Sequence, residues 1–208
     1  AYSYAPMVGR ADNGDSIAEY DSNADWQLAV AGMLRAIKAA FPERQLWGNI
    51  IETPHTGAAW APFLPYLDGI QEERFATGWR GEPALTPEQW HGMLGRAEQA
   101  LAAGKGVVLY GQGQQDDFAR LRFALASYLL VASPDARASF RYTYTSHYEQ
   151  LWWYPEYGYD LGLPAGPRYE QGGRWLRDFN CARVSVDPAR QRGEIERLPC
   201  AAAEEGRP

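Results

Sequence analysis

Apolar residues recur every three to four positions in two segments of the first half of the chain, and this spacing predicts two amphipathic helices. The first follows a capping residue at Asn23 and ends at Pro42, which cannot continue a helix. The second begins at Thr86, with Pro87 at the first helical position and Gln89 three residues after the cap. The expected buried positions are Trp26, Val30, Met33, Leu34, Ile37 and Phe41 in the first helix, and Trp90, Met93, Leu94, Ala97 and Leu101 in the second.

Short apolar segments around these helices predict strands. The strand segments are 5–12, 45–51, 66–75 and 105–113. A third amphipathic helix is expected to carry Phe118, Leu121, Leu125, Tyr128 and Leu129 on its apolar face. Its last part, "YLLVA", either continues the helix or turns into a strand. Strands that alternate with helices in this way indicate a parallel α/β architecture.

The regular alternation ends near residue 138. "FRYTYTSHYEQ" (140–150) alternates like an edge strand, and the aromatic stretch 151–167 follows it. "RWLRDFNCARVSVDP" (174–188) then predicts a closing β-hairpin. The last residues, "AAAEEGRP" (201–208), are acidic and contain Gly and Pro, so we expect a disordered tail.

Composition and charge exclude some classes of function. With 208 residues the chain is long enough for one ordinary domain, and its formal net charge of −6 argues against a nucleic-acid surface. No apolar run approaches the ~18 residues that a membrane span needs. Aromatic residues make up 13% of the chain, with 8 Trp and 13 Tyr. Such rings either fill a core or form the flat surface of a sugar-binding cleft.

Cysteine and histidine give no support for a metal site, and no cofactor is expected. Cys181 and Cys200 allow one disulfide in the C-terminal segment but are equally compatible with two reduced thiols. The histidines, which lack the spacing of metal ligands, are His55, His91 and His147. The chain starts at Ala1 without Met or a signal-like segment, so we expect a processed N-terminus and a secreted or cell-envelope location.

Carboxylates follow two of the predicted strands, at the ends where parallel α/β folds carry their chemistry. Asp12 closes the first strand, and Glu72 and Glu73 close the third. Glycoside hydrolysis requires two facing carboxylates, because one protonates the leaving oxygen while the other attacks the sugar or activates water. Asp12 and Glu73 are therefore the candidate catalytic residues. The alternative is that they are ion-pair partners of neighbouring arginines such as Arg10 and Arg74.

Side-chain alternation along the third strand favours Glu73 over Glu72 as the catalytic acid. Glu73 shares a face with Gly69 and Gln71, whose small or polar side chains suit a barrel interior. Glu72 shares the other face with Ile70, which is expected to pack under a helix. The sequence contains neither a G-x-x-x-x-G-K-[ST] phosphate loop nor a G-x-S-x-G nucleophile elbow.

Three stretches resemble the glycoside hydrolases of hypothetical glycosyl hydrolase family 15: "LDGIQEERF", "KGVVLYGQG" and "WWYPEYGYDLGLPAGP" with the later "GGRWLRDFNCARVSVDP". The similarity covers most of residues 5–190, and P-E-Y-x-x-D-L-G is its specific element. It implies an α/β fold of the (β/α)8 TIM-barrel type, distantly related to endo-α-1,4-polygalactosaminidases. A whole barrel takes about 250 residues, so the resemblance implies the C-terminal part, about strands 4 to 8, with a short C-terminal β-hairpin. The expected division is a partial barrel (1–138), an aromatic-rich rim with the hairpin (139–198) and a tail (199–208).

The resemblance also assigns positions to individual residues. It places Asp12 at the acid of the fourth barrel strand and Glu73 at the acid of the sixth. Glu156 and Asp160 fall on the P-E-Y-x-x-D element. The chain departs from the family pattern at Gly158, where an acid is usual.

The expected function is hydrolysis of a polysaccharide or oligosaccharide. The candidate substrate-binding residues are Asn49, Glu72, Tyr110, Gln112, Trp152, Trp153, Glu156, Tyr157 and Asp160. The aromatic stretch is either a sugar platform at the barrel rim or a plug against the outside of the barrel. The alternative function is a non-catalytic carbohydrate-binding or assembly protein built on a truncated, degenerate barrel.

A further partner is expected because a partial barrel exposes a strand edge and an uncovered core. The partner would be the missing N-terminal half-barrel or another chain that covers the edge of the first strand. The chain would then be a fragment, a processed piece bound to its other half, or a half-barrel sealed by a partner.

Overall fold

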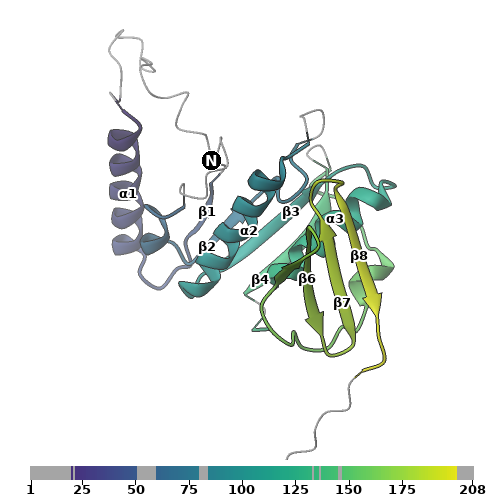
Figure 1. Cartoon of the computed structure of the whole chain (residues 1–208). Coiled ribbons are helices and arrows are strands. Elements are labelled where there is room, and N and C mark those ends of the chain that lie inside the picture. The colour runs from purple at the N-terminus through teal and green to yellow at the C-terminus, as the bar shows by residue number, and fades with distance from the viewer. Residues whose placement is uncertain are drawn as a thin grey trace, which may run out of the picture.

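Two four-stranded sheets form the framework of the protein, one parallel and one antiparallel (Figure 1). The computed structural model describes residues 20, 22–50, 60–79, 84–132, 134–135, 137–144 and 147–200. These residues form a mixed α/β structure, which confirms the expected fold class at this level. The expected strand 5–12, with Asp12, and the tail 201–208 lie outside the described residues.

The parallel sheet has the strand order β1-β2-β3-β4, which is also the order of the strands in the chain. Its strands are β1 (Trp47–Asn49), β2 (Gly69–Glu72), β3 (Gly106–Gln112) and β4 (Ala138–Thr143). The register places Asn49 opposite Gln71 and Gln112 opposite Thr143. All four carboxyl ends therefore lie along one edge of the sheet. The sheet continues past residue 138, because β4 pairs with β3.

The helices agree with the predicted segments in position. They are α1 (Asn23–Ala40), α2 (Pro87–Ala102) and α3 (Phe118–Val131), together with the short 3-10 helices η1 (Leu64–Tyr66) and η2 (Pro155–Gly158). The capping box of Thr86 and Gln89 is confirmed. The expected cap of the first helix is wrong, because Ser22 accepts the hydrogen bond from Asp25 N. "YLLVA" continues α3 as far as Val131.

Two residues of the expected apolar stripe of the first helix do not pack inward. Met33 is exposed, and Phe41, which ends the helix, is exposed as well. Trp26, Val30 and Leu34 do pack against the core. The apolar face of α1 is thus narrower within the described residues than its sequence predicts.

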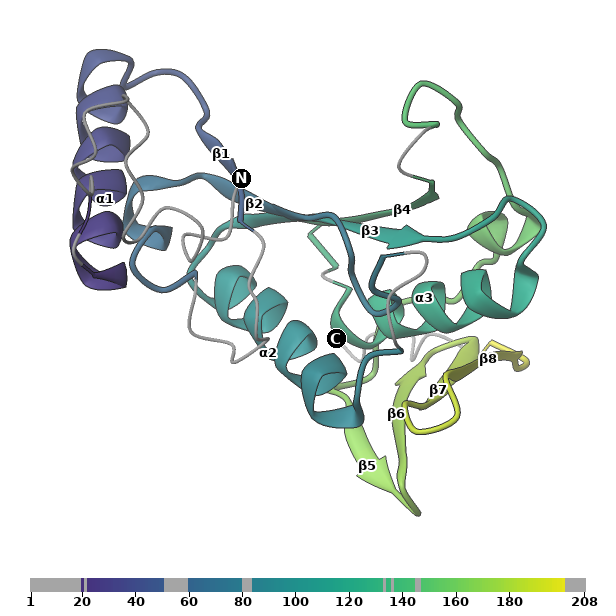
Figure 2. The ribbon, with the colours of Figure 1, turned by 90° about the horizontal axis from the view of Figure 1, so that it is seen from above.

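Helix α3 lies between the two sheets. Figure 2 shows α2 and α3 on one face of the parallel sheet, with the antiparallel sheet on the far side of α3. Buried residues cover both sides of α3, and they include Leu121, Phe123, Ala124, Leu125, Ala126, Ser127 and Leu130. One continuous core joins Val107 and Leu109 of the parallel sheet to Val184 and Val186 of the antiparallel sheet.

The antiparallel sheet is larger than the predicted hairpin. Its strands, in order, are β5 (Tyr169–Gln171), β6 (Arg174–Phe179), β7 (Ala182–Asp187) and β8 (Arg192–Arg197). The hairpin is confirmed as β6 and β7, but β5 and β8 extend it on both sides. Cys181 and Cys200 form a disulfide that ties the end of β8 to the β6–β7 turn.

The two faces of the parallel sheet differ in character. Ile70, Leu109 and Tyr142 are buried on the face toward the helices. The other face carries Trp47, whose ring lies across Gly69 and Gly106, where an added Cβ would collide with it. Two small residues thus let one large ring cover the amino-terminal part of this face.

No closed barrel is formed by the part of the chain that the structure describes. The expected N-terminal half-barrel or partner chain against the first strand therefore stays a prediction. Within the described ranges, no helix is long and apolar enough to cross a membrane.

Close packing of β8 on α3 generates a stability prediction. A Cβ on Gly193 would lie 2.5 Å from Arg122 O and 2.8 Å from Phe123 Cα. Because backbone atoms cannot move aside, Gly193→Ala should lower the free energy of unfolding by about 1–3 kcal/mol in urea denaturation.

The matched control is Gly95→Ala, in the interior of α2, where an added Cβ meets no heavy atom within 4 Å. This change should stabilise the protein by about 0.5–1 kcal/mol, since alanine loses less backbone entropy in a helix. Equal stability of the two variants would contradict the close approach of β8 to α3.

Candidate active site

Polar side chains gather at the carboxyl edge of the parallel sheet, on the face away from the helices. Side chains alternate along a strand, so Asn49 and Gln71 lie on the same face as Trp47, and Glu73 follows directly after β2. Gln112 and Thr143 end β3 and β4 opposite one another. We call Asn49, Gln71, Glu73, Gln112 and Thr143 the edge cluster.

Glu73 is half-buried at the centre of the edge cluster. Its Oε1 atom accepts a hydrogen bond from Gln71 Nε2 at 3.2 Å. Its backbone carbonyl accepts another from Gln112 Nε2 at 2.7 Å. Glu73 is therefore held between β2 and β3 while its carboxylate keeps access to solvent.

The turn after Glu73 is fixed by buried contacts with β3 and α3. Thr77 Oγ1 accepts a hydrogen bond from Gln112 N, and Thr77 O accepts one from Arg120 Nη2. Ala76 is buried in this turn with a φ of 61°. A non-glycine residue in the left-handed region costs about 1–3 kcal/mol and persists only where its surroundings determine it.

Tyr148 contacts the edge cluster from the segment after β4, and no pattern in the sequence predicted this contact. Its hydroxyl accepts a hydrogen bond from Gln112 Nε2 at 2.9 Å. Its ring lies edge-on to Tyr110, with 6.0 Å between the ring centroids. Burial raises the pKa of Tyr148, and the Glu73 carboxylate acts in the same direction. The phenol thus stays protonated and available as a donor.

Several polar atoms at this edge are buried without a hydrogen-bond partner among the described residues. They are Asn49 Oδ1, Gln112 Oε1, Thr143 Oγ1 and Arg141 Nε. An unsatisfied buried polar group costs about 1–3 kcal/mol, so proteins rarely retain one without a use. Together these atoms leave hydrogen-bonding capacity at this edge that the described residues do not use.

Glu72 lies outside the edge cluster, although it was expected to bind substrate. Its side chain is 1% exposed and points under α2, where it accepts a hydrogen bond from Arg96 Nη2 at 2.7 Å. Arg96 also lies over the ring of Trp60. Burial raises the pKa of Glu72, and the Arg96 cation opposes this effect. The Glu72 carboxylate thus has a structural role and is too buried to contact a sugar.

The aromatic stretch packs mainly as a plug along β4 and α3. Trp152 and Tyr154 are buried against Leu121 and Tyr142. The Tyr157 hydroxyl accepts a hydrogen bond from Tyr142 N, which is a backbone group of the edge strand β4. Burial raises the pKa of Tyr157 to about 12, so this hydroxyl stays neutral. The expected substrate-binding role of Trp152 does not fit its burial, whereas Trp153 is exposed.

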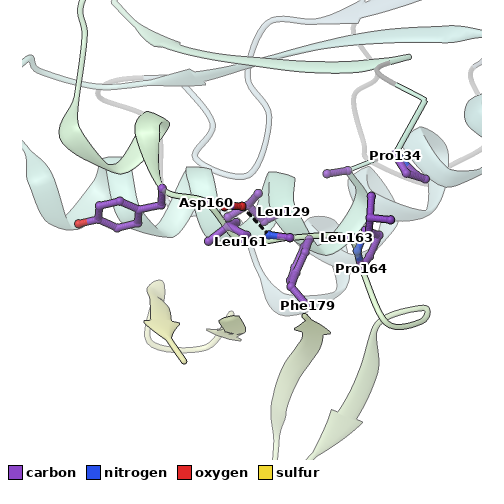
Figure 3. A pocket seen from close by; sticks show the side chains of 10 residues that line it. Leu129, Pro134, Asp160, Leu161, Leu163, Pro164 and Phe179 are labelled. Carbon is purple, nitrogen blue, oxygen red and sulfur yellow. Dashed lines mark hydrogen bonds between the residues drawn. The ribbon is translucent and has the colours of Figure 1, made fainter. Parts of the chain in front are cut away.

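The two acids of the aromatic stretch lie away from the edge cluster. Glu156 accepts a hydrogen bond from Arg122 Nε on the outside of α3. Asp160 Oδ1 accepts one from Gly162 N beside a pocket of about 460 Å³, which Figure 3 shows with Leu129, Pro134 and Phe179 in its wall. This pocket is at the carboxyl end of α3, and α3 runs antiparallel to the strands. Asp160 therefore lies near the amino ends of the strands.

The structure thus brings together Glu73, Asn49, Tyr110 and Gln112 and separates from them Glu72, Glu156 and Asp160. Asp12 falls outside the described residues, so its place opposite Glu73 stays a prediction. Across the described ranges, no group of three or more His, Cys, Asp or Glu side chains could hold a metal ion.

The structure is that of an α/β protein with a carboxylate and amides at the carboxyl edge of its parallel sheet, which is where parallel α/β proteins bind their ligands. The chain matches the family model described as "Hypothetical glycosyl hydrolase family 15" over residues 2–183. It belongs to this family, as its sequence motifs indicated. A search of curated proteins finds no match to the chain.

The buried ion pair generates a prediction that separates Glu72 from its neighbour Glu73. Glu72→Gln removes the Glu72 counter-charge from the buried Arg96 cation. Loss of one partner of a buried pair costs about 3–5 kcal/mol, so the urea midpoint should fall sharply.

Glu194→Gln is the control, because Glu194 forms exposed ion pairs with Arg174 and Arg192. Exposed pairs contribute about 0–1 kcal/mol, so its unfolding curve should stay close to that of the original protein. A Glu72→Gln variant as stable as this control would show that the ion pair is not structural.

Proposed function

We propose that this protein is a glycoside hydrolase that uses Glu73 as one of its two catalytic carboxylates. The observation that carries the proposal is the position of Glu73, half-buried at the carboxyl edge among buried polar atoms that have no hydrogen-bond partner in the described part of the chain. Membership of a glycosyl hydrolase-like family supports the same reaction class. Asp12 is the proposed second carboxylate, as the family resemblance implies.

The proposed fold is the C-terminal part of a (β/α)8 barrel. Support comes from successive βα units, from helices on one face of the sheet and from polar side chains on the other. In such a barrel the face that carries Gln71 and Tyr110 would be the interior. The edge cluster would then line the catalytic mouth.

The proposed roles follow from the chemistry of the side chains. Glu73 would donate a proton to the leaving oxygen or act as nucleophile or base, and Gln71 fixes the carboxylate through its amide. Tyr148 is a neutral donor beside the cluster and would bind a sugar hydroxyl. The free acceptors of Asn49 and Gln112 would bind further hydroxyls.

A second candidate function is carbohydrate binding without turnover. The observation that favours it is the exposure of Trp153, which offers a ring for sugar stacking in a groove that Glu73 does not line. The two functions differ in one result, because only the hydrolase releases new reducing ends from a glycan.

We further propose an exported location. The disulfide between Cys181 and Cys200 supports it, since such bonds persist mainly in oxidising compartments.

The central test is Glu73→Gln, which keeps the side-chain shape and the hydrogen bond from Gln71 but removes the negative charge. Hydrolysis should fall by at least about a hundredfold, because general acid–base catalysis contributes about 10²–10⁴. The measurement is release of reducing ends from neutral, amino-sugar and uronic-acid polysaccharides, with urea unfolding in parallel.

The neighbouring variant Glu72→Gln provides the opposite pattern. It should lose stability but keep turnover per folded molecule at low temperature, because the side chain of Glu72 is buried against Arg96, away from the edge cluster. Full activity in Glu73→Gln would end the catalytic assignment of Glu73.

A further inference from the structure

A groove of about 560 Å³ lies at the amino end of α3, outside the parallel sheet. The loop that follows β3 forms one wall, and the exposed part of the aromatic stretch forms the other. Its lining residues are Gln114, Gln115, Asp116, Phe118, Trp153, Tyr154 and Pro155. The loop starts immediately after Gln112 and Gly113, so this wall of the groove begins at the carboxyl end of β3.

Two large rings are exposed in this groove. Trp153 is 72% exposed and Phe118 is 50% exposed. Exposed aromatic side chains that share a groove mark a surface built to contact something apolar and flat. Trp152 and Tyr154 of the same stretch pack in the core, whereas the Trp153 ring stays accessible to a ligand.

Contacts from behind fix the walls of the groove. The Trp153 ring lies edge-on to Tyr157, with centroids 5.7 Å apart, and the Phe118 ring lies edge-on to Tyr154, with centroids 6.4 Å apart. The Tyr154 hydroxyl donates a hydrogen bond to Gln115 O at 3.0 Å, which ties the loop to the aromatic stretch. A ligand would thus find the groove formed, with little ordering cost on binding.

The polar lining selects the charge of the ligand. Gln114 and Gln115 supply amides, and Asp116 supplies a carboxylate, whereas no cation is found among the described residues that line the groove. The nearest arginines of α3 are engaged elsewhere: Arg120 donates to Gln112 O and Thr77 O, and Arg122 donates to Glu156. A carboxylate-bearing ring would therefore meet repulsion, and an uncharged or positively charged ring would not.

We propose that this groove is a sugar-binding subsite that takes an uncharged or amino-sugar pyranose ring and rejects a uronic acid. The ring's apolar C–H face stacks on Trp153, and its hydroxyls bind the amides of Gln114 and Gln115 and the carboxylate of Asp116. The subsite holds a ring of the same glycan whose bond is cleaved at the edge cluster. This inference rests on the proposed function and names its substrate class.

The test measures binding by the full chain that carries Glu73→Gln, so that turnover does not consume the probe. The probes are cellohexaose, the hexamer of N-acetylglucosamine, the hexamer of glucosamine and the hexamer of galacturonic acid, titrated by calorimetry. At least one of the first three should bind, and the galacturonic acid hexamer should not. Adding Trp153→Ala should weaken binding about tenfold or more, the loss expected for a stacked ring.

Two further variants define the subsite. Asp116→Lys should reduce affinity for the glucosamine hexamer and introduce affinity for the galacturonic acid hexamer, because it inverts the charge of the lining. Phe41→Ala removes another exposed aromatic ring at the end of α1 and should leave all affinities unchanged.

The outcomes separate this subsite from the proposed catalysis. If Trp153→Ala abolishes binding but no glycan is hydrolysed by the original chain, the subsite stands and the hydrolase assignment fails. If Glu73-dependent hydrolysis occurs and Trp153→Ala leaves both KM and binding unchanged, the subsite is overturned and the hydrolase stands. Self-association that Trp153→Ala abolishes, without binding of any hexamer, would make the groove a protein interface and overturn the proposal.

Discussion

The burial of α3 on both sides is the constraint on which the rest of the structure depends. Its first turn is capped by Asp117, and its last carbonyls, those of Leu129, Leu130 and Ala132, accept hydrogen bonds from Arg177 of β6. A cation at a helix carboxyl end is favourable both as a donor and against the helix dipole. The antiparallel sheet thus fixes α3 from outside, and α3 in turn fixes the β3 end through Arg120 and the backbone oxygens of Gln112 and Thr77.

Because side chains alternate along a strand, the neighbouring acids Glu72 and Glu73 point to opposite faces of the parallel sheet. Glu72 pairs with Arg96 under α2, and Glu73 lies at the carboxyl edge beside Gln112. A shift of one residue in the pairing of β2 would exchange these environments. The core contacts of Ile70, on the face of Glu72, hold the register against such a shift. The burial that stabilises the fold therefore also determines which carboxylate meets solvent.

Features that depend only on adjacent residues, such as a helix cap or the alternation of side chains along a strand, could be predicted from the sequence. The capping box of α2 and the packing of Ile70 under a helix were both predicted from a few adjacent residues, whereas Glu72, on the face of Ile70, was wrongly assigned to substrate binding. Tyr148 could not be predicted, because its contact with Gln112 joins segments that are far apart in the chain. The strands β5 and β8 were missed for a related reason. Their sequences are mostly exposed and polar, and their pairing with β6 and β7 and the packing of β8 on α3 make them strands.

The aromatic stretch shows why composition alone does not distinguish packing from binding. A sheet edge needs a cover, and the Tyr157 hydroxyl replaces a missing strand partner at Tyr142 N. Tyr154 fills the space above α3, and its hydroxyl orders the loop that carries Gln115. Neighbouring side chains in an extended stretch point in opposite directions, so burying Trp152 and Tyr154 directs Trp153 outward. The exposure of the Trp153 ring thus follows from the burial of its two neighbours. In the proposed subsite, this exposed ring stacks on a sugar.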